Sequence, residues 1–163
     1  MEIEFRKAVR EDAETLIGIY NASFYSDYVK YGECPAYGRT REMMEQSILE
    51  YPKFLILCQD RPVGCVSCKE TGSGTYEVGC LCVIPEFQGK GIGTSAMEFV
   101  KSCYPDWKRF ALITPVDKQE NVRFYTEKCG FGIRSVEMDG HVQVVRLVLE
   151  RENPDSVFTG GTK

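Results

Sequence analysis

A glycine-rich segment carries the clearest chemical signal in this sequence. It reads Gln88-Gly89-Lys90-Gly91-Ile92-Gly93-Thr94 and lies between a predicted strand and a predicted helix. The first backbone N–H groups of a helix have no partner within it, and the helix dipole adds positive potential there, so the segment can bind a phosphate or diphosphate. Glycine lets the anion approach the backbone closely, and Lys90 can add a charge at the rim.

Other anion-binding motifs fit this segment less well. A P-loop ends in Gly-Lys-Ser or Gly-Lys-Thr, and that ending is absent here. Gly91, Gly93 and Ala96 match the dinucleotide-binding fingerprint, but that fingerprint follows its strand directly, whereas residues 84–88 intervene in this chain. A nicotinamide-dependent reductase is therefore the weaker alternative, and it predicts stabilisation by NAD(P)H.

The elements that must position the segment follow from hydrophobic periodicity and from Gly and Pro breakers. Strands are predicted over residues 4–9, 54–58, 63–69, 76–83, 110–114, 133–138 and 142–149. Helices are predicted over 12–20, 40–51, 93–103 and 119–128, with an aromatic loop over 24–38. The order β-α-α-β-β-β-α-β-α-β-β predicts an α/β protein with a mixed sheet of six to seven strands flanked by about four helices.

Two strand regions have distinctive local signals. Alternation over 76–83 puts Glu77, Gly79, Leu81 and Val83 on one face of a strand that must end at Pro85. Asp139-Gly140 is a strong hairpin turn signal between the last two predicted strands. The strand over 76–83 precedes the glycine-rich segment, so it is the element expected to orient that segment.

Length and charge limit the class of protein. The chain has 163 residues, 43% of them hydrophobic, and a net charge of −4. We expect one domain over residues 1–150 and a flexible polar tail over 151–163. The longest apolar run, residues 54–58, is too short to span a membrane, and no basic cluster suggests nucleic-acid binding. We therefore expect neither membrane nor nucleic acid as a partner, and a monomer or homodimer.

The cysteine content indicates a reducing compartment. Eight cysteines occur without a secretory signal, which is typical of reduced thiols in a cytoplasmic protein. Cys65-x-x-Cys68 and Cys80-x-Cys82 could supply four zinc ligands, but they lie in strand-patterned sequence, whereas zinc ligand pairs normally lie on turns. His141 is the single histidine of the chain. We expect no metal site.

A second motif, read together with the glycine-rich segment, makes a family resemblance more specific than either motif alone. The run Val83-x-Pro85-x-Phe87-Gln88-Gly89-x-Gly91-x-Gly93 is followed about thirty residues later by Phe124-Tyr125-x-x-x-Cys129-Gly130-Phe131. Together, and with the element order over residues 3–150, these resemble the GNAT superfamily of acetyl-coenzyme A-dependent N-acetyltransferases. The resemblance implies a GNAT-like fold and direct acetyl transfer to a primary amine of a small molecule or peptide in a ternary complex. The alternative is a non-catalytic coenzyme A-binding sensor or interaction module.

The resemblance also implies roles for particular residues. Backbone groups of Leu81, Cys82 and Val83 would pair with the pantetheine arm of acetyl-CoA. The amides of Gln88, Gly89, Lys90, Gly91, Ile92, Gly93 and Thr94 would hold its diphosphate. Asn121 and Tyr125 would face the thioester, with Tyr125 as the general acid that protonates the departing thiolate.

The general base and the acceptor site are less defined. Gly79 stands where several relatives carry a Glu, and Glu77 lies one pleat away, roughly 7 Å along the strand, so it would need a water relay. Asp117 is a second candidate base. An acceptor could contact Asp27, Tyr28 and Glu33 in the aromatic segment, which could equally be a packed loop. A covalent acetyl-cysteine is disfavoured because no histidine is placed to activate a thiolate.

Overall fold

The computed structural model describes residues 1–152, so the tail expected over 151–163 lies outside the described residues from position 153 onward. The chain forms two compact units. The first comprises Met1–Lys69 and Val78–Tyr104, and the second comprises Glu70–Glu77 and the described residues from Pro105 to 152. The single domain expected over residues 1–150 stays a prediction.

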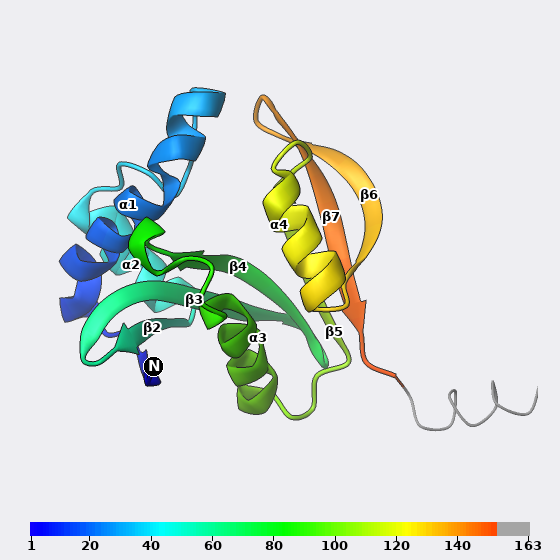
Figure 1. The fold of residues 1–163 in the computed structure, drawn as a ribbon, viewed down its shortest axis with the longest axis horizontal. Helices are drawn as coiled ribbons and strands as arrows, with labels where there is room; N and C mark the ends of the chain where they lie inside the picture. Colours follow the sequence, from blue (N-terminus) through cyan, green and yellow to red (C-terminus); the bar gives the residue numbers. More distant parts are fainter. Residues whose placement is uncertain (153–163) are drawn as a thin grey trace, which may run out of the picture. The chain divides into compact units, whose positions relative to one another are not determined.

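The predicted order of elements is confirmed (Figure 1). The strands are β1 (Ile3–Lys7), β2 (Lys53–Cys58), β3 (Arg61–Gly72), β4 (Thr75–Val83), β5 (Arg109–Pro115), β6 (Gly132–Asp139) and β7 (Val142–Glu150). The α-helices are α1 (Ala13–Tyr31), α2 (Arg41–Glu50), α3 (Ile92–Cys103) and α4 (Gln119–Arg123). The strands form a seven-stranded sheet in the order β1-β2-β3-β4-β5-β7-β6. β4 and β5 are parallel and the β1–β2, β2–β3, β5–β7 and β6–β7 pairs are antiparallel, so the sheet is mixed, as expected.

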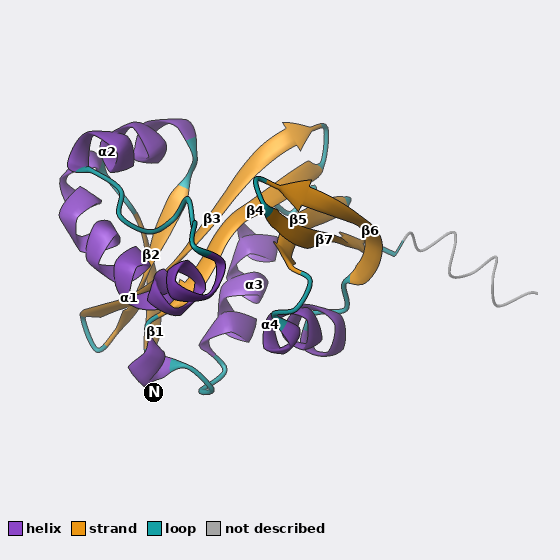
Figure 2. Cartoon of the chain, turned by 90° about the horizontal axis from the view of Figure 1, so that it is seen from above, coloured by secondary structure: helices purple, strands orange, loops and turns teal. Residues whose placement is uncertain are grey.

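In the first unit, β2 and β3 lie between α1 and α2 on one side and α3 on the other (Figure 2). Alternation along β2 explains this arrangement. Phe54 meets Phe99 of α3 edge-on, with ring centroids 4.9 Å apart, whereas the neighbouring Lys53 approaches Tyr20 of α1. Both faces of β2 are therefore covered, which is why its sequence is a nearly continuous apolar run.

Helix α1 is longer than the sequence pattern predicts. It continues to Tyr31 and ends where Gly32 adopts a φ of 76°, so residues 24–31 are helical and the expected loop over 24–38 is wrong for that part. Tyr20 and Phe24 are four residues apart and their rings meet edge-on at 6.0 Å, as neighbours on one helix face do. The exposed Tyr25 and Val29 add apolar residues to the opposite side, which hides the helical period.

Two tight turns join antiparallel strands. Gln59 and Asp60 both have positive φ, so β3 begins at Arg61 rather than at Val63 as predicted. In the β6–β7 hairpin Asp139 pairs with Val142, so the turn residues are Gly140 and His141, one position later than the Asp139-Gly140 signal.

The packing of β3 against β4 depends on Gly64. A Cβ at this position would collide with the backbone carbonyl of Cys82 in β4 and lie 3.3 Å from the Cα of Val83. The lack of a side chain at Gly64 therefore sets how closely the two strands approach. No described helix has the length and apolar character needed to cross a membrane.

Candidate functional site

The glycine-rich segment forms the connection between β4 and α3 in the first unit. Gly89 and Gly91 have φ values of 74° and 82°, and Gly91 is the N-cap of α3. No side chain caps this helix N-terminus, and no atom lies within 4 Å of the Cβ positions of Gly89 or Gly91. No side chain therefore caps the first amides of α3, and no side chain of Gly89 or Gly91 blocks access to them. An anion can reach these amides directly.

Gln88 ties this segment to the end of β4. Its side-chain Nε2 donates to the backbone oxygen of Val83 at 2.8 Å, and the amide of Ile84 donates to the oxygen of Val63 on β3 at 2.8 Å. The structure therefore brings together, in one unit, the two groups of residues expected to hold the cofactor: Leu81, Cys82 and Val83, and Gln88, Gly89, Lys90, Gly91, Ile92, Gly93 and Thr94.

β4 pairs with β5 over three residues only, Thr75, Tyr76 and Glu77. The parallel register thus ends at the boundary of the second unit. Leu81–Val83, whose backbone is expected to pair with a pantetheine arm, lie beyond the end of this register along the strand.

Tyr125 and Asn121 lie in the second unit. The expected helix over 119–128 is α-helical only to Arg123 and continues as a π-helical turn over Phe124–Lys128. Tyr125 is buried, with its ring edge-on to Phe124 at 4.9 Å and to Phe131 at 5.5 Å. The Asn121 side chain donates to Thr114 Oγ1 at 3.3 Å. A π turn is rare and commonly occurs at functional sites because it redirects side chains within a helix.

The candidate bases are charged groups of the same unit. Glu77 is half-buried, and its Oε1 is 4.0 Å from Nη1 of Arg146, which also binds Glu137 at 2.6 Å. Hydrogen bonding to Glu137 and the charge of Glu77 raise the pKa of Arg146 further, so this cation is permanent. Asp117 is exposed and follows the end of β5 at Pro115.

A side chain at position 79 would collide with Tyr51 unless the tyrosine ring moved. A Cβ on Gly79 would lie 2.7 Å from two ring carbons of Tyr51 and 2.8 Å from its hydroxyl oxygen. Tyr51, the C-cap residue of α2, thus occupies the space of a side chain at Gly79. Sequence analysis missed this role, since Tyr51 is remote from β4 in sequence and belongs to no motif.

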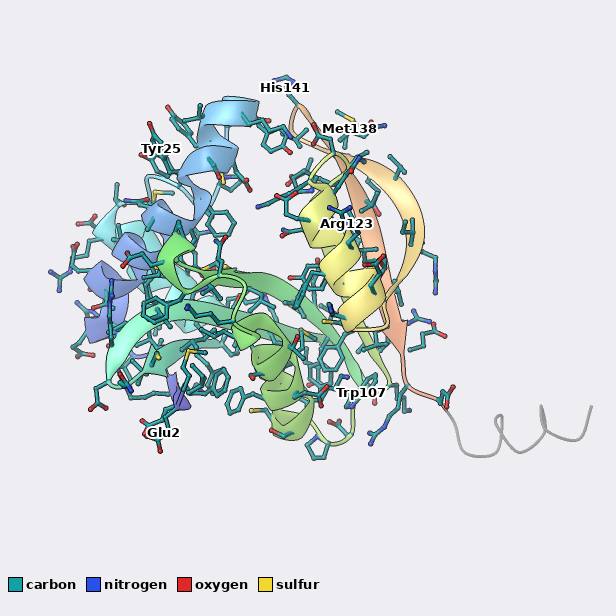
Figure 3. All side chains as sticks on the ribbon, in the orientation of Figure 1. Glu2, Tyr25, Trp107, Arg123, Met138 and His141 are labelled. Carbon is teal, nitrogen blue, oxygen red and sulfur yellow. The ribbon has the colours of Figure 1, made fainter. Side chains whose placement is uncertain are left out.

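The residues expected to contact an acceptor lie in and just after α1. Tyr28 is exposed and stacks on Tyr37 with ring centroids 4.6 Å apart. The exposed Tyr25, labelled in Figure 3, approaches the Tyr37 ring at 6.0 Å. Asp27 is on α1 and Glu33 follows its C-cap, and both are half-buried. The aromatic segment is therefore ordered packing around Tyr37 rather than an open loop.

Thiols line the face of the first unit's strands covered by α1. The Tyr20 hydroxyl lies 3.8 Å from Sγ of the buried Cys65. Burial raises the pKa of Cys65, whereas hydrogen bonds from Cys82 and Tyr20 and the charges of Lys53 and Arg39 lower the pKa of Cys80.

Known proteins share the fold. The model of the Acetyltransferase (GNAT) family matches residues 11–131. An acetyltransferase from Thermus thermophilus superposes with a TM-score of 0.75 at 18% identity, over 93% of this chain and 98% of that one. PaiA N-acetyltransferase from Thermoplasma acidophilum, solved in complex with coenzyme A, gives 0.67 at 20% identity, over 90% and 98% of the two chains. Ard1 from Thermoplasma volcanium gives 0.75 at 15% identity, over 94% and 100%.

A curated relative is similar over a shorter stretch. The uncharacterized protein YrkN of Bacillus subtilis (strain 168) is 41% identical over 51 residues, which are 31% of this chain and 28% of the relative. The chain therefore aligns with less than a third of that relative's length. The family match is much longer and covers most of the 163 residues. With the sheet order and the uncapped glycine-rich start of α3, it establishes that the chain belongs to the GNAT family of acetyltransferases.

Proposed function

We propose that the protein transfers the acetyl group of acetyl-CoA to a primary amine of a small molecule or peptide, by direct attack of the amine in a ternary complex. The observation that carries this proposal is the N-terminus of α3, which has no side-chain cap and is preceded by two glycines in the left-handed region. Members of this family are acyltransferases that use acetyl-CoA, and such a helix start suits its diphosphate.

The residues of the first unit fit the cofactor. The amides of residues 88–94 would bind the diphosphate, with Lys90 exposed at the rim, and the backbone of Leu81–Val83 would bind the pantetheine arm. The Val83 oxygen already accepts from Gln88, which holds the segment against the strand end. Acetyl-CoA supplies the acetyl group as a thioester, which is activated toward amines.

Tyr125 is the proposed general acid. A phenol with a pKa near 10 can protonate a thiolate whose conjugate acid has a pKa of about 8.5, because the transfer is close to balanced in energy. The aromatic rings of Phe124 and Phe131 fix the Tyr125 ring, so little rotamer freedom is lost on reaction. Asn121, one turn earlier and held by Thr114, would orient the thioester.

Glu77 is the proposed general base, acting through water. An alkylamine has a pKa of about 10.4 and is mostly protonated at pH 7, so its proton must be removed before attack. Because Tyr51 fills the space at Gly79, a carboxylate must act from another position. The Glu77 carboxylate lies beside the Arg146 guanidinium, with Oε1 4.0 Å from Nη1. Asp117 is the second candidate.

The acceptor would bind beside the tyrosines of α1. Tyr28 offers an exposed aromatic face, and Asp27 and Glu33 offer carboxylates that suit the ammonium form of an incoming amine. These three residues are proposed acceptor contacts.

The test combines calorimetry with a thiol assay. We expect acetyl-CoA to bind, NADPH not to bind, and free coenzyme A thiol to appear when amines from a panel of polyamines, amino sugars, amino acids and peptide N-termini are added. Binding without thiol release from any amine would contradict the proposed reaction and favour a coenzyme A-binding module. No heat with acetyl-CoA, while the protein is folded, would overturn the proposal as a whole.

A further inference from the structure

Lys53 is a buried cation in the first unit. Only 4% of its surface is exposed, although it begins β2 next to the exposed end of α2. Its ammonium nitrogen lies 5.3 Å from the ring centroid of Tyr51 and 6.0 Å from that of Tyr20. Two aromatic faces thus flank the charge, as they do where proteins desolvate a cation.

Arg39 approaches the same tyrosine. Its guanidinium carbon lies 5.4 Å from the Tyr20 ring centroid, Nε donates to the oxygen of Pro35 at 3.0 Å, and Nη1 donates to Ser47 Oγ at 3.2 Å. These bonds hold the guanidinium in one orientation. Arg39, Lys53, Tyr20 and Tyr51 are called the cation cluster below.

The two cations Arg39 and Lys53 differ from most arginines of the described chain in their partners. Within residues 1–152, neither Arg39 nor Lys53 forms an ion pair with a carboxylate. Most other arginines of the described chain do form one, even at exposed positions: Arg6, Arg10, Arg41, Arg61, Arg109, Arg134 and Arg146. A buried ammonium without a carboxylate counter-ion is costly, and an anion bound from outside would offset that cost.

The nearby thiols do not balance the charge. Burial lowers the pKa of Lys53, while the thiols of Cys65, Cys80 and Cys82 act in the opposite sense and Arg39 adds to the lowering. Cys80 is the neighbour with a lowered pKa, so a thiolate there could offset one positive charge. Arg39 and Lys53 are joined by the exposed Lys69, whose Nζ lies 5.8 Å from the Tyr51 ring centroid, so one thiolate would leave positive charge for an external anion.

The cluster also adjoins the strand on which the cofactor is expected to lie. Tyr51, whose ring carries Lys53 on one side, is packed against Gly79 of β4. Gly79 is two residues before Leu81, the first residue of the proposed pantetheine contact. The cluster is therefore part of the region where an acceptor amine must approach.

We propose that Arg39 and Lys53 bind an anionic group of the acceptor, a carboxylate or a phosphate, so that the acceptor is a primary amine with a negatively charged second group. This inference rests on the proposed function. A guanidinium presents paired N–H donors that match a carboxylate or phosphate, and the aromatic walls strengthen the charge interaction by excluding water. The carboxylates of Asp27 and Glu33 would then bind the amino group of the same acceptor.

The first experiment compares matched amines at saturating acetyl-CoA. Each set contains a carboxylate amine, its amide, the corresponding aminoalkyl phosphate or phosphonate, and a diamine of the same length, tested over α-amino acids and longer chains. We expect the highest kcat/KM for an anionic member, at least ten-fold above its amide and above the diamine. The carboxylate and phosphate arms show which anion the cluster takes.

The second experiment tests the residues. Arg39→Met and Lys53→Met should each raise KM for the anionic acceptor about ten-fold or more, as loss of a charge-assisted hydrogen bond predicts, with the Kd for acetyl-CoA unchanged. Arg41→Met and Lys7→Met, at exposed positions on α2 and β1, are the matched controls and should leave KM unchanged. Lys53→Met should also keep or raise the Tm, because it removes an unpaired buried charge. A merely structural Lys53 would lower the Tm when replaced.

Three results would overturn the inference while leaving acetyl transfer intact. One is a preference for neutral amines or diamines, and another is an unchanged KM in both variants. The third is a change confined to the rate at which Cys80 reacts with iodoacetamide, which would mean that Cys80 is the partner of Lys53. If no amine is acetylated, calorimetry decides: anionic amines must bind wild-type protein more tightly than the Arg39 and Lys53 variants, and equal binding would contradict the inference.

Discussion

The ring of Tyr125 packs edge-on against Phe124 and Phe131, and its hydroxyl is the group proposed to act chemically. Tyr125→Phe removes that hydroxyl and keeps the ring packing. We expect kcat to fall by ten-fold or more with little change in the Kd for acetyl-CoA, since a general acid contributes at that order of magnitude or above. Steady-state kinetics and calorimetry measure the two quantities.

The control for Tyr125 is Tyr104→Phe at the C-cap of α3. It removes a hydroxyl from a tyrosine outside the proposed site and should leave kcat unchanged. A Tyr125→Phe variant with wild-type kcat would assign the proton donor to another group.

A substitution at Gly79 tests whether the Tyr51 ring occupies the space that a side chain at this position of β4 would need. Gly79→Ala places a Cβ 2.7 Å from the Tyr51 ring, and overpacking of this kind costs about 1–3 kcal/mol in the free energy of unfolding. In a Tyr51→Ala background the same change should cost much less, because the ring is gone. Urea unfolding of the four proteins gives the coupling energy, and equal costs in both backgrounds would disprove the contact.

Single residues were predictable from the sequence only where a motif contains them. The glycines at 89, 91 and 93 and Tyr125 belong to spaced patterns, so local chemistry identified them. Tyr51 and Lys53 have no such pattern, because their roles arise when the end of α2 meets β4 and α1. Lys53 adjoins an apolar run, and its burial follows from the register of β2 with β3, which sequence alone does not fix.

At the scale of elements, the start of α3 carries the cofactor prediction. Gly91→Ala should raise the Kd for acetyl-CoA about ten-fold or more, because a Cβ would project toward the anion and the φ of 82° disfavours alanine. Gly32→Ala is the matched control, since Gly32 has a φ of 76° and nothing within 4 Å of its Cβ position. Both variants should lose about 1 kcal/mol of stability, and only Gly91→Ala should lose affinity in calorimetry.

The β6–β7 hairpin predicts a pH dependence of stability. Hydrogen bonds from Arg146 and Ser135 lower the pKa of Glu137 from 4.5. A lowered folded-state pKa contributes stability that is present above the unfolded value and is lost as the pH falls through the folded value. The urea midpoint of Glu137→Gln should therefore be below wild type at pH 6, and the difference should vanish as the pH falls well below 4.5.

The control for the hairpin is Glu2→Gln, an exposed carboxylate with no ion pair among the described residues. Its midpoint should follow wild type at every pH. A Glu137→Gln difference that stayed constant down to pH 2 would show that the contribution of Glu137 does not depend on its charge.

Element types and order were predictable because periodicity and breakers are local signals. The predicted ends of helices and strands were wrong where a second local effect masked the hydrophobic pattern. The exposed aromatic residues of α1 hid its period beyond Tyr20, and positive φ at Gln59 and Asp60 moved the start of β3. The change from α- to π-helical backbone at Phe124 is not encoded in any spacing rule, so the predicted helix over 119–128 gave no sign of it.

At the scale of the whole molecule, Trp107 allows a test of the expected single domain. It is the one tryptophan of the sequence and lies in the second unit, 5.0 Å from the ring of Phe110, whereas α1, α2 and α3 belong to the first unit (Figure 3). One domain predicts that Trp107 fluorescence and helical circular dichroism give the same urea midpoint. Separate midpoints would show that the units unfold independently.

Saturation with acetyl-CoA adds to this test. At 100 times Kd a ligand raises the free energy of unfolding by about 2.7 kcal/mol, provided that it does not bind the unfolded chain. Both midpoints should rise together if the protein is one cooperative domain. A rise seen by dichroism alone would confine the stabilisation to the first unit.

The order of elements along the chain and the family were predictable from sequence, because the first depends on local periodicity and the second on two spaced motifs. The order of strands in the sheet was not predicted. The division into two compact units was not predicted either, because β4 passes through both and its sequence shows no break.

Gly64 has a consequence for mutational tolerance. It lies far from both motifs in sequence, yet every side chain larger than hydrogen would push the Cys82 carbonyl, and with it the strand that leads into the glycine-rich segment. In a saturation library selected for acetylation, position 64 should therefore be as depleted of variants as the residues proposed to bind the diphosphate, although it belongs to neither motif.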